Sequence, residues 1–311
     1  FKQKTAYEIR LSLVGSEMCI RDSALVVTFR SSGVVNFATG AMALYTAYTF
    51  SFLRRGELLV PFPGPPATID LGGNLTMPSA FILSMVLAGL FGVLLHLLVF
   101  RPLRNAPAVA KAVASIGVLL VVQAALAQRV GTSPVSTPPI LPGGTAELFG
   151  ETIRLDRLWF AAVIVLLTFA LAAAFRFTRF GLATRAVAET EKGALVTGLS
   201  TDRIAMANWA LSAMVAGLAG ILISPIVPVI PVSYTLFIVP ALAAALMGSF
   251  TAVVPAVAAG LAIGMLQSLA VQQQFDHDWL PQAGLAELVP LALILGVLVV
   301  RGRPLPSRGA V

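Results

Sequence analysis

Five uncharged polar side chains lie inside long apolar stretches of this sequence, where they could bind a small solute passing through the protein. They are Asn36, Gln123, Asn208, Ser212 and Gln267. Amides and hydroxyls can hydrogen-bond a polar solute without the cost of burying a charge. Each could instead bond a neighbouring helix, which is the commoner role of such groups. Both interpretations assign these residues to helices rather than to a catalytic centre.

Sequence motifs of catalysis and nucleotide binding are absent. There is no GxxxxGK[ST] phosphate loop, no HExxH, no GxSxG and no paired-carboxylate arrangement. His96 precedes Arg101 by five residues and is interpreted as a polar residue near the cytosolic interface; His277 is assigned to an external loop. Cys19 is the only cysteine, so no internal disulfide can form, and no Cys/His cluster has zinc spacing. We expect no enzyme activity, no cofactor and no metal.

The composition requires a membrane. Of 311 residues, 58% are hydrophobic and 11% are charged, whereas soluble domains carry about 25% charged residues. Residues 79–100 form an apolar run without an acid or a strong base, and about 20 such residues span a bilayer. The net charge of +7 comes from Lys and Arg in short loops, which the positive-inside bias explains without a nucleic-acid partner.

We therefore predict an all-α polytopic membrane bundle of about eight spans, the first of them truncated. The apolar segments are 24–29 (the truncated one), 36–53, 79–100, 108–128, 158–175, 207–223, 234–248, 251–271 and 285–300. Pro240 lies in the short segment 234–248, which predicts a broken or re-entrant helix.

Small residues and prolines shape the later part of the chain. The pairs Ala216/Gly220 and Gly260/Gly264 have small-xxx-small spacing, which lets helices approach closely. Prolines recur at three-residue intervals in SPIVPVIPVSY, residues 224–234. This spacing is incompatible with a regular helix and predicts an extended external loop, with a lid over the pore as the alternative.

Charge predicts the orientation. Assigning residues 30–35, 101–111, 176–206 and 301–311 to the cytosol places twelve Lys and Arg inside and leaves five outside. The five are Arg54, Arg55, Arg129, Arg154 and Arg157. The positive-inside rule favours this arrangement in a bacterial inner membrane.

The longest cytosolic loop, residues 176–206, combines charge with helix-forming residues. It holds eight charged residues, each costing about 3 kcal/mol at a bilayer centre, so it stays in water. Its segment GLATRAVAETEKGALVTG is rich in good helix formers. We predict short cytosolic helices able to dock another protein, the last ending at Gly198 in a left-handed cap.

Residues 1–23 break the composition, with seven charged residues and no apolar run. They resemble translated sequencing-adapter read-through, and a genuine polar tail is the alternative. We expect residues 24–311 to form one membrane domain.

Two stretches resemble the H-type permeases of branched-chain amino acid ABC importers. The first is ALVVTFRSSGVVNFATG, residues 24–40, and the second is residues 176–220, including Ala188-Glu189, Gly198 and Thr201-Asp202-Arg203. With 241–269, the likeness covers about residues 24–300.

The resemblance implies functional residues. Those implied to couple to an ATPase are Glu189, Lys192, Gly193, Ala194, Gly198, Thr201, Asp202 and Arg203. The resemblance adds Gly33, Phe37 and Gly40 to the five uncharged polar residues that are candidates for lining the solute path. Lys192 and Gly193 stand where the general importer signature has Glu and Ala, and Ala41 stands where the family often has an acid.

The resemblance also implies partners and a solute class. The partners are an M-type permease subunit, two cytosolic ATP-binding subunits and an external solute-binding protein. The solutes are branched-chain amino acids or related amides and urea, moved inward. A stand-alone secondary transporter or channel is the alternative; the lack of ionisable residues at the middle of the spans disfavours ion coupling.

Overall fold

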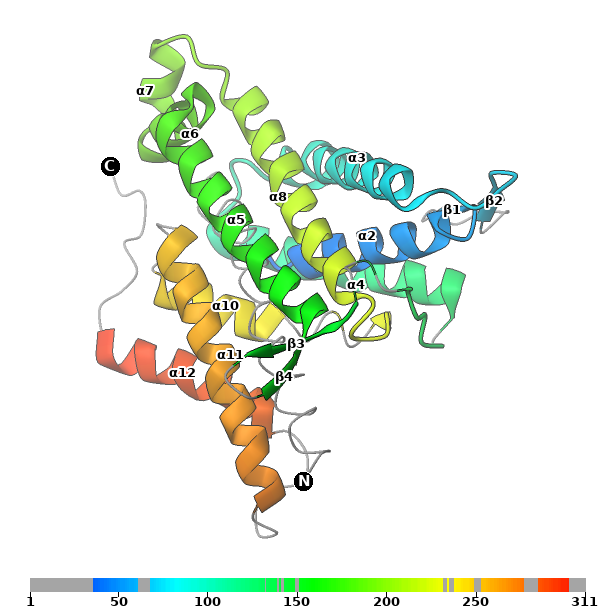
Figure 1. Cartoon of the computed structure of the whole chain (residues 1–311). Coiled ribbons are helices and arrows are strands. Elements are labelled where there is room, and N and C mark those ends of the chain that lie inside the picture. The colour runs from blue at the N-terminus through cyan, green and yellow to red at the C-terminus, as the bar shows by residue number, and fades with distance from the viewer. Residues whose placement is uncertain are drawn as a thin grey trace.

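A computed structural model describes residues 36–60, 68–131, 133–138, 140, 143–148, 151–231, 234, 238–248, 253–276 and 285–301. Helices dominate this part of the chain (Figure 1). The predicted all-α membrane bundle is thereby confirmed. The segments 1–23 and 24–29 and the residues Gly33 and His277 lie outside the described residues.

The helices follow the apolar runs closely. They are α2 (Thr39–Leu53), α3 (Met77–Leu95), the π-helical turn η1 (His96–Phe100), α4 (Ala108–Val130), α5 (Leu155–Phe177), α6 (Arg179–Glu189), α7 (Glu191–Val196), α8 (Thr201–Ile223), α10 (Ile238–Met247), α11 (Val253–Asp276) and α12 (Leu285–Arg301).

Within the described ranges, five helical segments are long and apolar enough to cross a membrane. They are Met77–Phe100, Ala108–Val130, Trp159–Phe177, Thr201–Ile223 and Val254–Gln273. The helix α10 has ten residues and Pro240 in its first turn, so it is about 15 Å long and too short to span. This agrees with the prediction of a broken segment.

Two short hairpins, which the sequence analysis did not predict, lie in segments assigned to the external side. Strand β1 (Glu57–Leu59) pairs antiparallel with β2 (Thr68–Asp70), and β3 (Thr145–Leu148) pairs with β4 (Glu151–Arg154).

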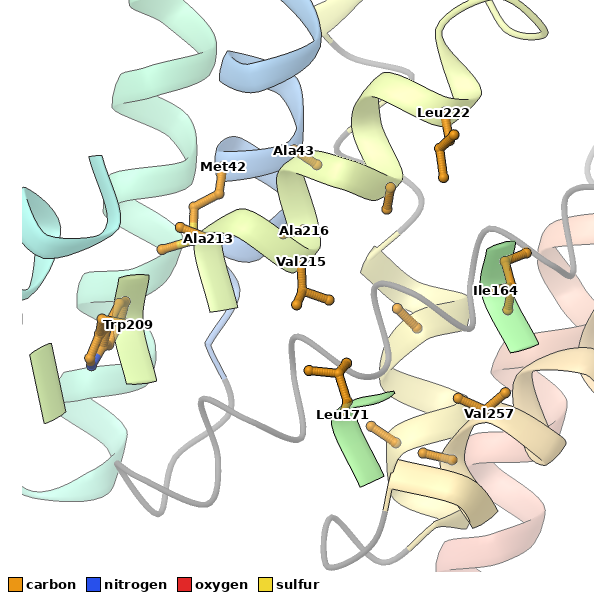
Figure 2. Packing of buried hydrophobic residues seen from close by; sticks show 14 of the residues in the cluster. Met42, Ala43, Ile164, Leu171, Trp209, Ala213, Val215, Ala216, Leu222 and Val257 are labelled. Carbon is orange, nitrogen blue, oxygen red and sulfur yellow. The ribbon is translucent and has the colours of Figure 1, made fainter. Parts of the chain in front are cut away.

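The helix α8 packs against α2 and α3 through small residues. A Cβ at Gly220 would overlap the carbonyl oxygen of Ala43 on α2, and one at Gly217 would lie 2.7 Å from Thr46 Oγ1. The predicted close approach at Ala216/Gly220 is confirmed. In Figure 2, Met42 of α2 lies beside Ala213, and Val215 of α8 points toward Leu171 of α5.

A second group of helices packs beside this one. The helices α10, α11 and α12 contact one another, and α11 also contacts α5 (Figure 1). Ile164 and Leu171 of α5 and Val257 of α11 belong to the same buried cluster as the α2–α8 contact (Figure 2). One continuous apolar core therefore joins both groups.

The segments predicted to be external meet at one end of the bundle. Val135 and Val229 form a β-bridge, Tyr48 Oη donates to the Val229 carbonyl at 3.0 Å, and the hydroxyls of Ser51 and Thr137 are 2.8 Å apart. The proline-rich segment is thus extended at Val229 as predicted. It is helical at Pro231 and Tyr234, so the prediction of a wholly extended loop was wrong there.

The glycine contact between α2 and α8 is testable. Gly220→Ala should destabilise the protein by about 1–3 kcal/mol, because the new methyl group overlaps a backbone atom that cannot move alone. Gly117→Ala on α4 is the matched control, since a Cβ there meets nothing within 4 Å and Ala favours helix by about 1 kcal/mol. The measurement is thermal unfolding in detergent; equal midpoints for the two variants would contradict the proposed packing.

Candidate functional site

The segment 176–206, predicted to be cytosolic, contains two short helices, as predicted, and the first is fastened to α5. Thr178 Oγ1 accepts a hydrogen bond from the Gly181 amide at 3.1 Å and caps α6. The guanidinium of Arg185 donates to the carbonyl oxygens of Phe175 and Arg176 at the end of α5. A cation at the C-terminus of a helix also complements its dipole. The turn from α5 to α6 is therefore fixed by side chains.

The helix α7 ends in the left-handed cap predicted at Gly198. Gly198 has φ +80°, its amide bonds the Leu195 carbonyl at 3.0 Å, and the Leu199 amide bonds the Ala194 carbonyl at 3.0 Å. These two bonds define a Schellman motif. They set the direction in which the chain leaves toward α8.

The coupling residues implied by the resemblance divide into exposed and internal groups. Exposed to solvent are Glu189, Gly193, Gly198 and Arg203, whereas Ala194 and Thr201 are buried and Asp202 is half-buried. The backbone of Lys192 lies in α7, and its side chain lies outside the described features.

Thr201, Asp202 and Arg203 were predicted to lie in the loop before the sixth span, yet they form the first turn of α8. Asp202 is stabilised there because a carboxylate complements the positive end of a helix. The hydropathy pattern predicted that this helix starts later in the sequence than it does, because its first turns carry polar residues.

Asp202 is bonded within the chain. Its carboxylate lies 3.1 Å from the guanidinium of Arg101 and 3.6 Å from that of Arg104. Arg104 also donates to Thr201 Oγ1 at 2.8 Å. Phe100 of η1 stacks on Trp209 of α8, with ring centroids 4.1 Å apart. The loop after α3 is thus attached to the start of α8, and sequence reasoning had given neither arginine a role.

Asn208 was predicted to line the path, and the structure places it between two helices. It is fully buried, and its Nδ2 donates to Thr184 Oγ1 of α6 at 3.3 Å. This bond joins α6 to α8.

The other path candidates do not form one cluster. Asn36, Phe37 and Gly40 lie together at the start of α2, and Ser212 is buried on α8 one turn after Asn208. Gln123 is half-buried on α4, while Gln267 is buried on α11, whose main neighbours are α10, α12 and α5. No group of acids, histidines or cysteines with metal-binding geometry occurs in the described part of the chain.

Sequence reasoning missed exposed apolar side chains on α6 and α7. Leu182 of α6 and Leu195 and Val196 of α7 are 67%, 52% and 89% exposed. In a segment predicted to stay in water, exposed apolar side chains are typical of a protein contact. The sequence pattern that could have indicated this contact is the presence of apolar residues inside a charged loop.

Residues 20–298 match the family model described as branched-chain amino acid transport system / permease component. The chain belongs to this family. The predicted resemblance to H-type permeases is confirmed, and the chain is a permease component of a transport system, a multi-pass membrane protein.

The relatives of this permease component are similar over almost their whole length. It is 26% identical over 297 residues to the high-affinity branched-chain amino acid transport system permease protein LivH of Escherichia coli strain K12, covering 94% of this chain and 93% of the relative. It is 25% identical, with the same coverage, to the permease protein BraD of Pseudomonas aeruginosa. A probable permease of Methanocaldococcus jannaschii is 26% identical over 254 residues, or 79% of this chain and 74% of the relative. The search of solved structures gave no match.

The bond between Asn208 and Thr184 predicts a measurable effect in this permease component. Thr184→Val leaves a buried amide without its acceptor and should lower the free energy of unfolding by about 1–3 kcal/mol. The control is Thr168→Val, whose hydroxyl, among the residues that the structure describes, bonds the Ile164 carbonyl of its own helix. Chemical unfolding in detergent measures both. If both variants lost the same free energy of unfolding, the bond between Asn208 and Thr184 would add no stability.

Proposed function

We propose that this permease component forms, with an M-type permease, the membrane path of an ATP-driven importer in a bacterial inner membrane. Its relatives are named as branched-chain amino acid permease proteins, which supports those amino acids, or related amides and urea, as its solutes. Two cytosolic ATP-binding subunits and an external solute-binding protein complete the assembly. Residues 24–311 are its permease domain, and it has no enzymatic activity of its own.

The observation that carries the proposal is the cytosolic segment α6–α7. It exposes Leu182, Leu195 and Val196 to solvent, and these apolar side chains offer an ATP-binding subunit a contact surface. Glu189, Gly193, Gly198 and Arg203 lie exposed on the same segment or just beyond it. A chain without its own phosphate loop requires such a surface to draw on ATP.

Motion at this surface can reach the membrane through three connections. Arg185 holds α6 to the end of α5, Thr184 bonds Asn208 in α8, and Asp202 joins α8 to the loop after α3. When ATP changes the spacing of the ATP-binding subunits, these contacts turn α5, α8 and α3 together. Nucleotide then biases a two-state equilibrium between inward-open and outward-open forms.

The assembled system should import leucine in an ATP-dependent manner. When the chain is reconstituted in liposomes with the M-type permease, both ATP-binding subunits and the binding protein, uptake should need all components. The chain alone should neither hydrolyse ATP nor accumulate leucine under a proton or sodium gradient. Gradient-driven uptake by the chain alone would replace the proposal with a secondary transporter.

The cap at Gly198 provides a test of coupling. Gly198→Val should strain a left-handed residue by about 1–2 kcal/mol and redirect the chain entering α8, so uptake and solute-stimulated ATPase should both fall. Membrane abundance should stay normal, because no atom lies within 4 Å of a Cβ at this position. Gly198→Asn is the control, since Asn tolerates the left-handed conformation. If Val and Asn behave alike, the cap does not direct coupling.

A further inference from the structure

The helix α2 begins beside the interior of α4 rather than beside its first residue. The backbone amide of Phe37, just before α2, donates to Ser115 Oγ at 3.1 Å. Ser115 is seven residues beyond the first residue of α4, which places it about 10 Å along that helix. Every residue of α2 except Phe52 is buried. The N-terminus of α2 therefore lies about 10 Å along α4 from the end of that helix predicted to face the cytosol.

Hydrogen-bond donors gather at this point. The first turn of any helix presents amide N–H groups that have no acceptor within the helix, and here they belong to Thr39, Gly40 and Ala41. The Asn36 side chain is 2% exposed. Its Oδ1 accepts from the Ala38 amide at 3.0 Å, which holds the carboxamide at the helix start. Its Nδ2 has no hydrogen-bond acceptor among the residues that the structure describes.

A cation on α4 favours an anion near the start of α2. Lys111 lies four residues before Ser115 on α4, and residues at this spacing share one face of a helix. Neither α2 nor α4 contains an acidic residue. Donors and a helix N-terminus thus lie beside Ser115, on a helix that also carries a lysine, and neither helix holds an acid. Such an arrangement binds carboxylate or phosphate groups.

We propose that the start of α2 is a carboxylate-binding subsite of the translocation path, where Asn36 Nδ2 and the first-turn amides bind the α-carboxylate of an amino acid solute. Lys111 contributes the positive field and does not need to touch the solute. The proposal rests on the proposed function, because it takes the solute to be an amino acid. It makes Asn36 a recognition residue on the inner half of the path.

Cysteine labelling tests whether a solute reaches this point. Cys19 is the only cysteine, so Cys19→Ser provides a cysteine-free background for Asn36→Cys. In the assembled complex during turnover, the thiol at 36 should react at least about tenfold faster with an anionic than with a cationic methanethiosulfonate, after correction for their intrinsic rates. Leucine should slow the reaction. The control is Ser84→Cys, fully buried on α3, which should stay unlabelled.

The labelling experiment has clear opposing outcomes. No reaction at position 36, or a reaction that ignores both leucine and the sign of the reagent, overturns the subsite. Adding Lys111→Gln should reduce the preference for the anionic reagent, and an unchanged preference would remove Lys111 from the proposal.

A near-isosteric variant tests recognition itself. Asn36→Asp keeps the acceptor for Ala38 and suits a helix N-terminus, so α2 should remain folded, but it replaces the donor with a negative charge. With the binding protein saturated by leucine, uptake should fall about tenfold or more, while the complex still assembles. The control is Ser84→Ala. If the unmodified complex imports leucine and Asn36→Asp retains its rate, the subsite is wrong and the proposed function stands. If the unmodified complex imports nothing, the proposed function itself fails.

Discussion

The backbone contact between α2 and α8 is the interaction on which the rest of this bundle depends. Lipid is as apolar as a leucine side chain, so helices in a membrane associate through close packing instead of through the hydrophobic effect. Gly217 and Gly220 bring the backbone of α8 against that of α2. The hydroxyls of Thr46 and Thr49 bond carbonyls of their own helix, at 2.7 and 2.8 Å. As a result α2 can be buried almost completely, with Tyr48 and Ser51 bonded to neighbouring segments near its C-terminal end.

The end predicted to be cytosolic is built by the opposite means. There the helices are connected by hydrogen bonds from a guanidinium to helix carbonyls and from an amide to a hydroxyl. A carboxylate that forms ion pairs with two arginines adds a third connection. Ion pairs that are open to water contribute little stability each, but together they fix orientation. Because α8 starts in this polar cluster and ends in the close-packed core, one rigid helix connects the two regions.

Apolar runs located most helices from sequence to within a few residues, because the bilayer fixes their length. The start of α8 was missed, since Thr201-Asp202-Arg203 is polar and helical at once. The hairpins were missed because strands of three or four residues carry no periodic signal. Asn208 was recognisable as a buried amide, but only the fold shows that its partner is Thr184. For Asp202, likewise, Arg101 and Arg104 are about a hundred positions away in sequence, and no local pattern pairs them.

The π-helical turn η1 fixes the number of residues between α3 and the arginine pair. This turn is closed by a hydrogen bond from the Arg101 amide to the His96 carbonyl at 2.7 Å. A π-helical turn contains one residue more than an α-helical turn. Removing that residue would restore a regular helix but rotate everything after it by about 100°. Phe100 would then leave Trp209, and Arg101 would turn away from Asp202. Insertions and deletions are therefore restricted here, and a relative with a different loop length would have to supply the arginine from another position.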